Sequence, residues 1–153
     1  MSCVFCDIVA GALPCHKIWE DTAHLAFLSI RPNTPGFSVV IPKRHLSSYL
    51  FAQTDEDINA LIKAAKQVGL LLDRALDGVA RTGMIFEGYG VDHLHAKLFP
   101  MHGTGNSSEF KPISSNVDKY FERYEGYISS HDHKPEDPAK LASLAAQIRS
   151  FAT

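Results

Sequence analysis

Apolar and polar residues alternate over residues 92–100, and this pattern predicts a β-strand. Successive side chains of a strand point to opposite faces, so one face belongs to the core and consists of Leu94, Ala96 and Leu98. The opposite face carries His93, His95 and Lys97. Three nitrogen-bearing side chains on one face need a partner, and phosphate or a metal ion suits them. Taken alone, the same alternation also fits an exposed strand face without a ligand.

Four further segments have the apolar, β-branched and aromatic content of strands, and turn residues separate them. They span residues 17–20, 24–30, 37–41 and 82–87. Gly88, Tyr89 and Gly90 form a turn between the last of these and the histidine-bearing strand. If the two strands pair as a simple hairpin, Glu87 lies near His93 and Ile85 near His95.

The clearest helix is predicted over residues 54–76. Thr54 is a plausible N-cap, Asp57 stands at the capping-box position, and Gly78 is a reasonable stop beyond the C-terminus. One apolar stripe follows the helical repeat and is formed by Ile58, Leu61, Ile62, Ala65, Val68 and Leu72. A segment over residues 4–10 predicts one or two more helical turns.

The C-terminal part of the chain carries two more stripes at helical spacing. The first consists of Val117, Tyr120, Phe121, Tyr124 and Ile128, and the second of Leu141, Leu144, Ala145, Ile148 and Phe151. A polar, proline-containing segment joins them, and we interpret its His131, Asp132 and His133 as surface residues without a role. These elements predict an α+β fold with an antiparallel sheet, one long packed helix and a helical C-terminal extension.

Composition narrows the class of protein. The 153 residues suit one domain, with 45% hydrophobic and 21% charged residues. A net charge of −2 argues against nucleic acid as a partner, because nucleic-acid-binding proteins usually present a basic face. No apolar run approaches the roughly 20 residues that a membrane span needs. Asp7 interrupts the apolar N-terminus, so no signal-peptide pattern is present and we expect a cytoplasmic protein.

The three cysteines do not make a disulfide framework. Cys3 and Cys6 form a C-x-x-C pair, which in a reducing compartment indicates metal binding or redox chemistry. The alternative is two small buried residues near a chain end. Cys15 stands alone and is interpreted as a structural or surface thiol.

Several motifs occur in one order along the chain. They are Cys3-Val4-Phe5-Cys6-Asp7-Ile8, Ala26-Phe27-Leu28-Ser29-Ile30-Arg31-Pro32, Pro35-Gly36, Val39-Val40-Ile41-Pro42-Lys43-Arg44-His45 and His93-Leu94-His95-Ala96-Lys97. With the long helix between the last two, this order resembles the histidine-triad (HIT) family of nucleotide hydrolases and transferases. The resemblance implies a HIT-like nucleotide-binding domain over residues 1–103. Residues 104–153 would form a helical extension packed on the same domain.

The resemblance implies a catalytic role for His95. This residue matches the middle histidine of the family's triad, which attacks the α-phosphorus of a nucleotide and forms a nucleotidyl-histidine that water then hydrolyses. Lys97 stands at the third triad position, where it would pair with phosphate oxygens as a point charge. The chain also departs from the family at Ser29, where relatives have a ribose-binding Asp, and at Glu87, where they have Asn.

The same resemblance implies a nucleoside pocket and a zinc site. The pocket residues would be Val4, Phe5, Ile8, Phe27, Ser29, Ile30 and Glu87. Zinc would be held by Cys3, Cys6, His45 and His93, a closed set of two thiolates and two imidazoles that is typical of a structural site. Glu87 would accept a hydrogen bond from the free nitrogen of His93 if the hairpin register holds.

The expected function is hydrolysis of nucleoside phosphate anhydrides, esters or amidates, with a purine nucleotide or dinucleoside polyphosphate as substrate and His95 as nucleophile. Nucleotidyl transfer to an acceptor other than water is one alternative. A catalytically silent nucleotide sensor or zinc-bearing interaction module is another. Family members are commonly homodimers through the long helix and an edge strand, and the resemblance implies the same here.

Overall fold

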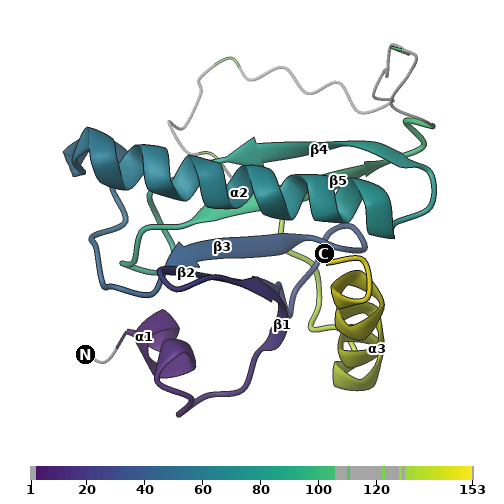
Figure 1. Ribbon diagram of the computed structural model, residues 1–153, viewed down its shortest axis with the longest axis horizontal. Coiled ribbons are helices and arrows are strands. Elements are labelled where there is room, and N and C mark those ends of the chain that lie inside the picture. The colour runs from purple at the N-terminus through teal and green to yellow at the C-terminus, as the bar shows by residue number, and fades with distance from the viewer. Residues whose placement is uncertain (1–2, 106–109, 111–121, 123–127, 129, 153) are drawn as a thin grey trace.

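The computed structural model describes residues 3–105, 110, 122, 128 and 130–152. Its five strands form one antiparallel sheet in the order β1-β2-β3-β5-β4 (Figure 1). The strands are β1 (His16–Glu20), β2 (His24–Leu28), β3 (Ser38–Pro42), β4 (Val79–Ile85) and β5 (Ala96–His102). The helices are α1 (Val4–Val9), α2 (Asp55–Ala75) and α3 (Pro138–Arg149), with a short 3-10 turn η1 (Leu50–Ala52). The α+β fold class predicted from the sequence is confirmed.

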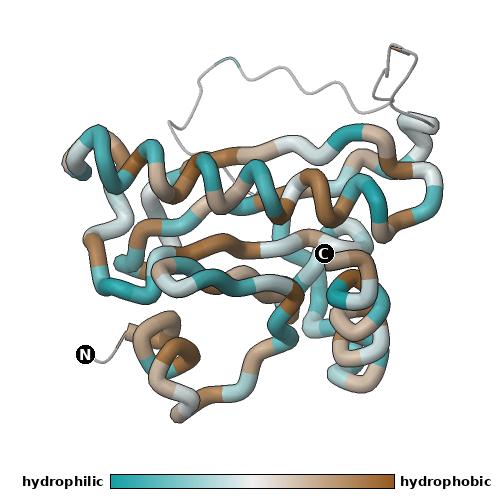
Figure 2. Tube along the Cα trace, viewed as in Figure 1, coloured by the Kyte–Doolittle hydropathy of each residue, from teal (hydrophilic) through white to brown (hydrophobic). Residues whose placement is uncertain are grey.

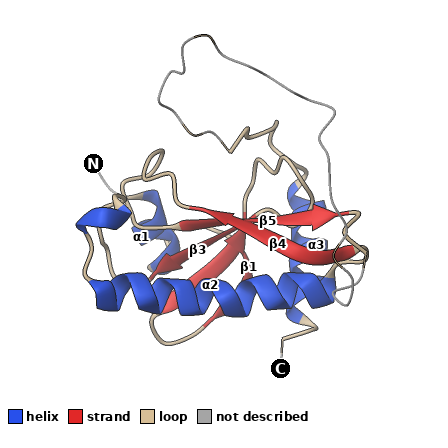
Figure 3. Ribbon diagram, turned by 90° about the horizontal axis from the view of Figure 1, so that it is seen from above, coloured by secondary structure: helices blue, strands red, loops and turns tan. Residues whose placement is uncertain are grey.

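The long helix α2 covers one face of the sheet (Figure 3). Thr54 is its N-cap, as predicted: the Thr54 hydroxyl accepts a hydrogen bond from the Asp57 amide at 3.2 Å. Hydrophobic residues recur along α2, as the brown bands in Figure 2 show. Those that are buried are Leu61, Ala64, Ala65, Val68, Leu71, Leu72 and Ala75. The predicted stripe was wrong at Ile62, which is exposed, because the buried face is rotated toward Ala64 and Leu71.

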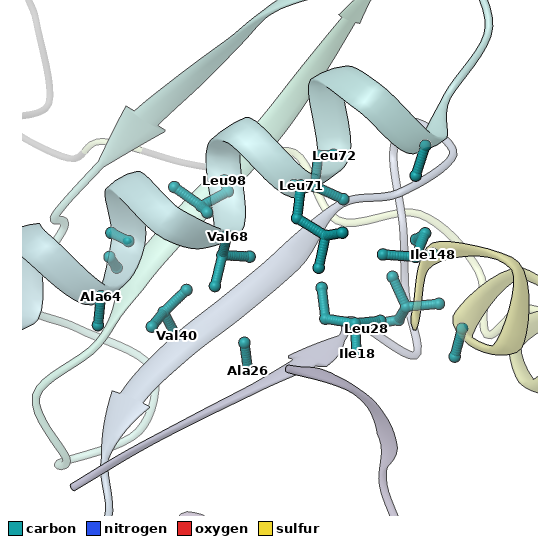
Figure 4. Close-up of a cluster of buried hydrophobic side chains, with 14 of the residues drawn as sticks. Ile18, Ala26, Leu28, Val40, Ala64, Val68, Leu71, Leu72, Leu98 and Ile148 are labelled. Atoms are coloured by element: carbon teal, nitrogen blue, oxygen red, sulfur yellow. The ribbon is translucent and has the colours of Figure 1, made fainter. Parts of the chain in front are cut away.

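The C-terminal helix α3 extends the same core beside β1 (Figure 1). Its Leu141, Ala145 and Ile148 are buried, and Ile148 points toward Ile18 and Leu28 in Figure 4. Asp137 caps the helix by accepting a hydrogen bond from the Ala139 amide at 2.9 Å. The stripe expected over residues 117–128 lies outside the described residues, apart from Glu122 and Ile128.

The other face of the sheet is covered by α1. A second apolar cluster lies there, formed by Leu25, Phe27, Val39 and Ile41 and packed against Phe5, Ile8, Val9 and Cys15. Both faces of β2 and β3 are therefore buried, which explains why residues 37–41 are almost continuously apolar. Within the described residues, no helix combines the length and the apolar character that crossing a bilayer requires.

The strand predicted over residues 92–100 begins later, at Ala96. Leu94, Ala96 and Leu98 are buried against α2 as expected, but the chain before Ala96 is not strand. The last pair of the β3–β5 ladder is Val40 with Ala96, and Pro42 has no N–H to continue it. The His93 and Leu94 amides instead donate to the carbonyls of Val91 and Leu46, both at 2.8 Å.

The pairing of β4 with β5 also differs from the simple hairpin. Ile85 pairs with Lys97, two residues along from the expected His95. β4 ends at Ile85 and β5 starts at Ala96, so a ten-residue connection replaces the tight turn at Gly88–Gly90. This register moves Glu87 away from His93 and toward Lys97.

Candidate functional site

A cavity of about 440 Å³ opens on the α1 side of the sheet. The apolar part of its wall comes from α1, β2 and β3, where Phe5 packs edge-to-face on Phe27 with ring centroids 5.5 Å apart. Six of the seven residues predicted to contact a nucleotide line the cavity, namely Val4, Phe5, Ile8, Phe27, Ser29 and Ile30. Glu87 is not among the lining residues. The volume falls in the range of about 300–1,000 Å³ that is usual for small-ligand sites.

His95 lines this cavity and is almost completely buried. Its Nδ1–H donates a hydrogen bond to the His93 carbonyl at 2.6 Å, which leaves the Nε2 lone pair for a ligand. Burial lowers the pKa of the His95 imidazole, and the neighbouring Lys97 ammonium lowers it further, although the bond to the His93 carbonyl acts in the opposite direction. The site therefore favours a neutral imidazole with Nε2 unprotonated, the form of histidine that acts as a nucleophile.

Lys97 lies on the same face and also lines the cavity, opposite Val39 of β3. Its ammonium forms an ion pair with Glu87 and donates a hydrogen bond to the Ser130 hydroxyl at 3.0 Å. The expected bond between Glu87 and His93 was wrong, because the strand register brings Glu87 to Lys97 instead. The Glu87 side chain is 3% exposed, and its Oε2 has no hydrogen-bond partner among the described residues.

Cys3, Cys6, His45 and His93 lie together at the end of α1, and their candidate ligand atoms are all within 4.8 Å of one another. The His93 Nε2–H donates to the Pro42 carbonyl at 2.8 Å, so the unprotonated Nδ1 faces the thiols. Cys3 Sγ lies 3.4 Å from His93 Nδ1, and Cys6 Sγ lies 3.4 Å from His45 Nδ1. Tetrahedral zinc with Zn–S bonds of about 2.3 Å and Zn–N bonds of about 2.0 Å separates S and N ligands by about 3.5 Å. The cluster can therefore hold a metal ion.

The metal cluster and the cavity share one segment. His93 turns its ring toward the two cysteines, while its carbonyl oxygen orients the ring of His95. Burial also lowers the pKa of His93, which favours the neutral form that ligates metals. The predicted row of three basic side chains thus divides: His95 and Lys97 line the cavity, and His93 joins the cysteines.

Sequence reasoning missed three polar residues around the cavity. Arg31 and Asp132 line it, and Ser130 bonds to Lys97. Arg31 directly follows the predicted pocket residues Ser29 and Ile30, so its position in the sequence could have identified it. Ser130 and Asp132 lie in the polar segment that we interpreted as a surface linker, and no local pattern there indicates a contact with residues more than 30 positions away.

Comparisons with known proteins show which family and fold this chain shares. The HIT domain profile matches residues 10–104. The adenosine 5'-monophosphoramidase of Schizosaccharomyces pombe is 36% identical over 121 residues, which cover 74% of this chain and 88% of the relative. The crystal structure of a hypothetical histidine triad nucleotide-binding protein from Sulfolobus tokodaii is similar to this chain with a TM-score of 0.70 and 25% identity, covering 97% of this chain and 91% of that chain.

A zinc-bound histidine triad family protein from Mycobacterium smegmatis shares the fold, with a TM-score of 0.68 and 23% identity over 99% of this chain and 93% of that chain. The profile spans well over half of the sequence, and the five-stranded antiparallel sheet with its long helix is the fold of these relatives. The chain therefore belongs to the HIT domain family.

Proposed function

We propose that this protein hydrolyses nucleoside phosphate amidates, anhydrides or esters, dinucleoside polyphosphates included, through a nucleotidyl intermediate on His95. The observation that carries the proposal is the state of His95. Its Nδ1–H is held by a backbone carbonyl, and its ring lines a cavity large enough for a small ligand. The name of the Schizosaccharomyces pombe relative, an adenosine 5'-monophosphoramidase, supports an amidate as one substrate.

In this mechanism the His95 Nε2 lone pair attacks the α-phosphorus, and the bond from phosphorus to the leaving group breaks; an amine leaves after taking a proton from solvent water, and a phosphate leaves as its anion. The hydrogen bond from Nδ1–H to the His93 carbonyl stabilises the positive charge that the ring gains. Water then attacks phosphorus and loses a proton to solvent, the bond from phosphorus to His95 Nε2 breaks, and His95 leaves as a neutral imidazole with release of the nucleoside monophosphate.

Lys97 takes the third triad position in this proposal. A lysine ammonium is a compact charge that stabilises phosphate oxygens without a fixed geometry. The Ser130 hydroxyl and the Glu87 carboxylate hold this ammonium beside His95. Lys97 therefore acts as an electrostatic partner of the phosphate.

Lys97→Met is expected to lower the free energy of unfolding by about 3–5 kcal/mol, because it leaves the buried Glu87 carboxylate without its partner. Urea unfolding measures this loss. Adding Glu87→Gln to the same chain removes the uncompensated charge and is expected to restore most of the stability. If Lys97 acts on phosphate, the restored double variant still has kcat/KM at least about tenfold below wild type. Wild-type turnover in the double variant would show that the ion pair of Lys97 and Glu87 has only a structural role.

Zinc is the metal that best suits the Cys3, Cys6, His45 and His93 cluster, because two thiolates and two imidazoles fill a tetrahedral site. Since all four positions are then protein ligands, the ion has a structural role and does not enter the reaction. The zinc-bound Mycobacterium smegmatis protein supports this choice. When bound, zinc ties α1, which forms one wall of the cavity, to the segments after β3 and before β5.

The pocket assignment and the domain organisation follow the same proposal. The nucleoside lies against Val4, Phe5, Ile8 and Phe27, with Ser29 and Ile30 at the edge, and a purine suits the aromatic wall. Residues 1–103 form the nucleotide-binding domain, and residues 104–153 are an extension of it, consistent with the packing of α3 on the core.

The exposed Ile62 and Leu70 on α2 and Met84 on the edge strand β4 suit a homodimer interface. Sedimentation of the protein as a single chain would contradict this interface.

The proposed function is tested by incubating the protein with adenosine 5'-phosphoramidate and with diadenosine polyphosphates. Intact-mass analysis after rapid acid-free quenching is expected to show a protein species heavier by one adenylyl group. Release of AMP into water identifies a hydrolase, whereas an adenylylated phosphate or sugar phosphate among the products identifies a transferase. Binding of these compounds with neither adduct nor product identifies a nucleotide sensor and overturns the hydrolase.

A further inference from the structure

The polar segment before α3 forms part of the cavity rim. Two of its backbone amides bond to the connection after β2: His133 N–H donates to the Arg31 carbonyl at 3.2 Å, and Glu136 N–H donates to the Ile30 carbonyl at 2.9 Å. The side-chain Nδ2–H of Asn33 also donates to the Ser130 carbonyl at 2.6 Å. These bonds hold the segment, which lies beyond the HIT domain match, against the opening of the cavity.

Asp132 of this segment is the one acidic side chain among the described residues that line the cavity. Its Oδ1 accepts a hydrogen bond from the Ser130 hydroxyl at 2.5 Å, and the same hydroxyl accepts one from Lys97 at 3.0 Å. One hydroxyl group therefore separates the Asp132 carboxylate from the lysine beside His95. Within the described part of the chain, the second carboxylate oxygen of Asp132 has no hydrogen-bond partner and is available to a ligand.

We propose that Asp132 binds the ribose hydroxyls of the substrate and makes the enzyme selective for ribonucleotides over 2′-deoxyribonucleotides. This rests on the proposed function for the placement of the phosphate at His95. With phosphorus at His95 and the base against Phe5 and Phe27, the sugar lies between them, in the same cavity that Asp132 lines. A carboxylate accepts strong hydrogen bonds from hydroxyl groups, and a vicinal diol offers two of them.

The neighbouring polar groups suit a carboxylate in this role. Ser29 also lines the cavity, but its hydroxyl is neutral and already accepts a hydrogen bond from the Arg31 amide at 3.2 Å. Lys97 and Arg31 line the same cavity and offset the negative charge of Asp132. Ser130 fixes one carboxylate oxygen, so the side chain is oriented before the sugar arrives.

The test compares AMP with 2′-deoxy-AMP in binding to the full chain by titration calorimetry, and the corresponding phosphoramidates in turnover. Wild-type protein is expected to bind AMP about 10–100-fold more tightly than 2′-deoxy-AMP, the factor that a hydrogen bond to a charged group supplies. Asp132→Asn and Asp132→Ala are expected to remove most of this difference by weakening AMP, while 2′-deoxy-AMP binding stays within about twofold. Glu136→Gln, in the same segment but outside the cavity lining, is the matched control and keeps the wild-type ratio.

Two results would overturn the ribose assignment. One is equal affinity of wild-type protein for AMP and 2′-deoxy-AMP; the other is an equal loss for both nucleotides in the Asp132 variants. Discrimination without any turnover would support the assignment while contradicting the proposed hydrolysis. Absence of binding by either nucleotide would contradict both.

Discussion

Replacing His95 with alanine is expected to lower kcat by at least about 10³-fold, because it removes the nucleophile on which the proposed covalent route depends. AMP binding is expected to stay within about tenfold of wild type, since the apolar wall and Lys97, which we propose to contact the nucleotide, are unchanged. The adenylyl adduct seen by intact-mass analysis should disappear in this variant. Turnover and binding are therefore measured on the same preparation.

His102→Ala is the matched control for this experiment. His102 is the last residue of β5, the strand that follows His95; it lies outside the cavity lining, and its Nε2–H donates to the Pro35 carbonyl at 2.8 Å. This variant is expected to keep wild-type turnover and to form the adduct. Wild-type turnover in the His95 variant would rule out the covalent route, and loss of folding there would show as a changed thermal transition.

Removing a metal ion from the Cys3, Cys6, His45 and His93 cluster is expected to lower the stability strongly. An ion that binds only the folded state, and not the unfolded chain, stabilises the protein by about 4 kcal/mol at a free concentration 1,000 times its Kd. For a domain of about this size, that corresponds to a fall in Tm of roughly 8–16 °C after chelation. Calorimetry before and after a chelator measures the shift, and metal analysis of the same sample identifies the ion. Adding zinc back should restore the Tm.

Cys6→Ser tests whether the four-residue cluster is the site of that metal. It removes one thiol of the set and is expected to lower the bound metal to well under one ion per chain, with the lower Tm of the chelated protein. Cys15→Ser is the control, because this thiol lies outside the cluster, and it should leave the metal content unchanged. Full metal content in the Cys6 variant would show that the metal binds at other residues.

The metal cluster and the candidate nucleophile are linked through His93. The His93 side chain faces the cysteines, and its carbonyl accepts the hydrogen bond that fixes the tautomer of His95. A loss of metal that loosens this residue therefore also loosens the orientation of the nucleophile. Structural stability and reactivity are expected to fall together when the cluster is disrupted.

The sequence by itself determined most of the core faces of the strands and of the long helix, Ile62 excepted. The alternation over Leu94, Ala96 and Leu98 correctly placed these residues in the core, and Thr54 was correctly predicted as the N-cap of α2. The order of motifs along the chain indicated the histidine-triad family and therefore its fold. These features are readable because they depend on local periodicity and on backbone groups only a few residues apart.

Only the tertiary structure decided which distant residues meet. Alternation gives the face of a strand but not its register, so the pairing of Glu87 with Lys97 depends on how β4 aligns with β5. The β3–β5 ladder ends before Pro42, and the His93 ring, which donates to the Pro42 carbonyl, turns its other nitrogen toward the cysteines. Asp132 reaches the cavity because backbone bonds from its segment join it to residues about 100 positions earlier. Such contacts form through space between separate elements, and no local pattern in the chain encodes them.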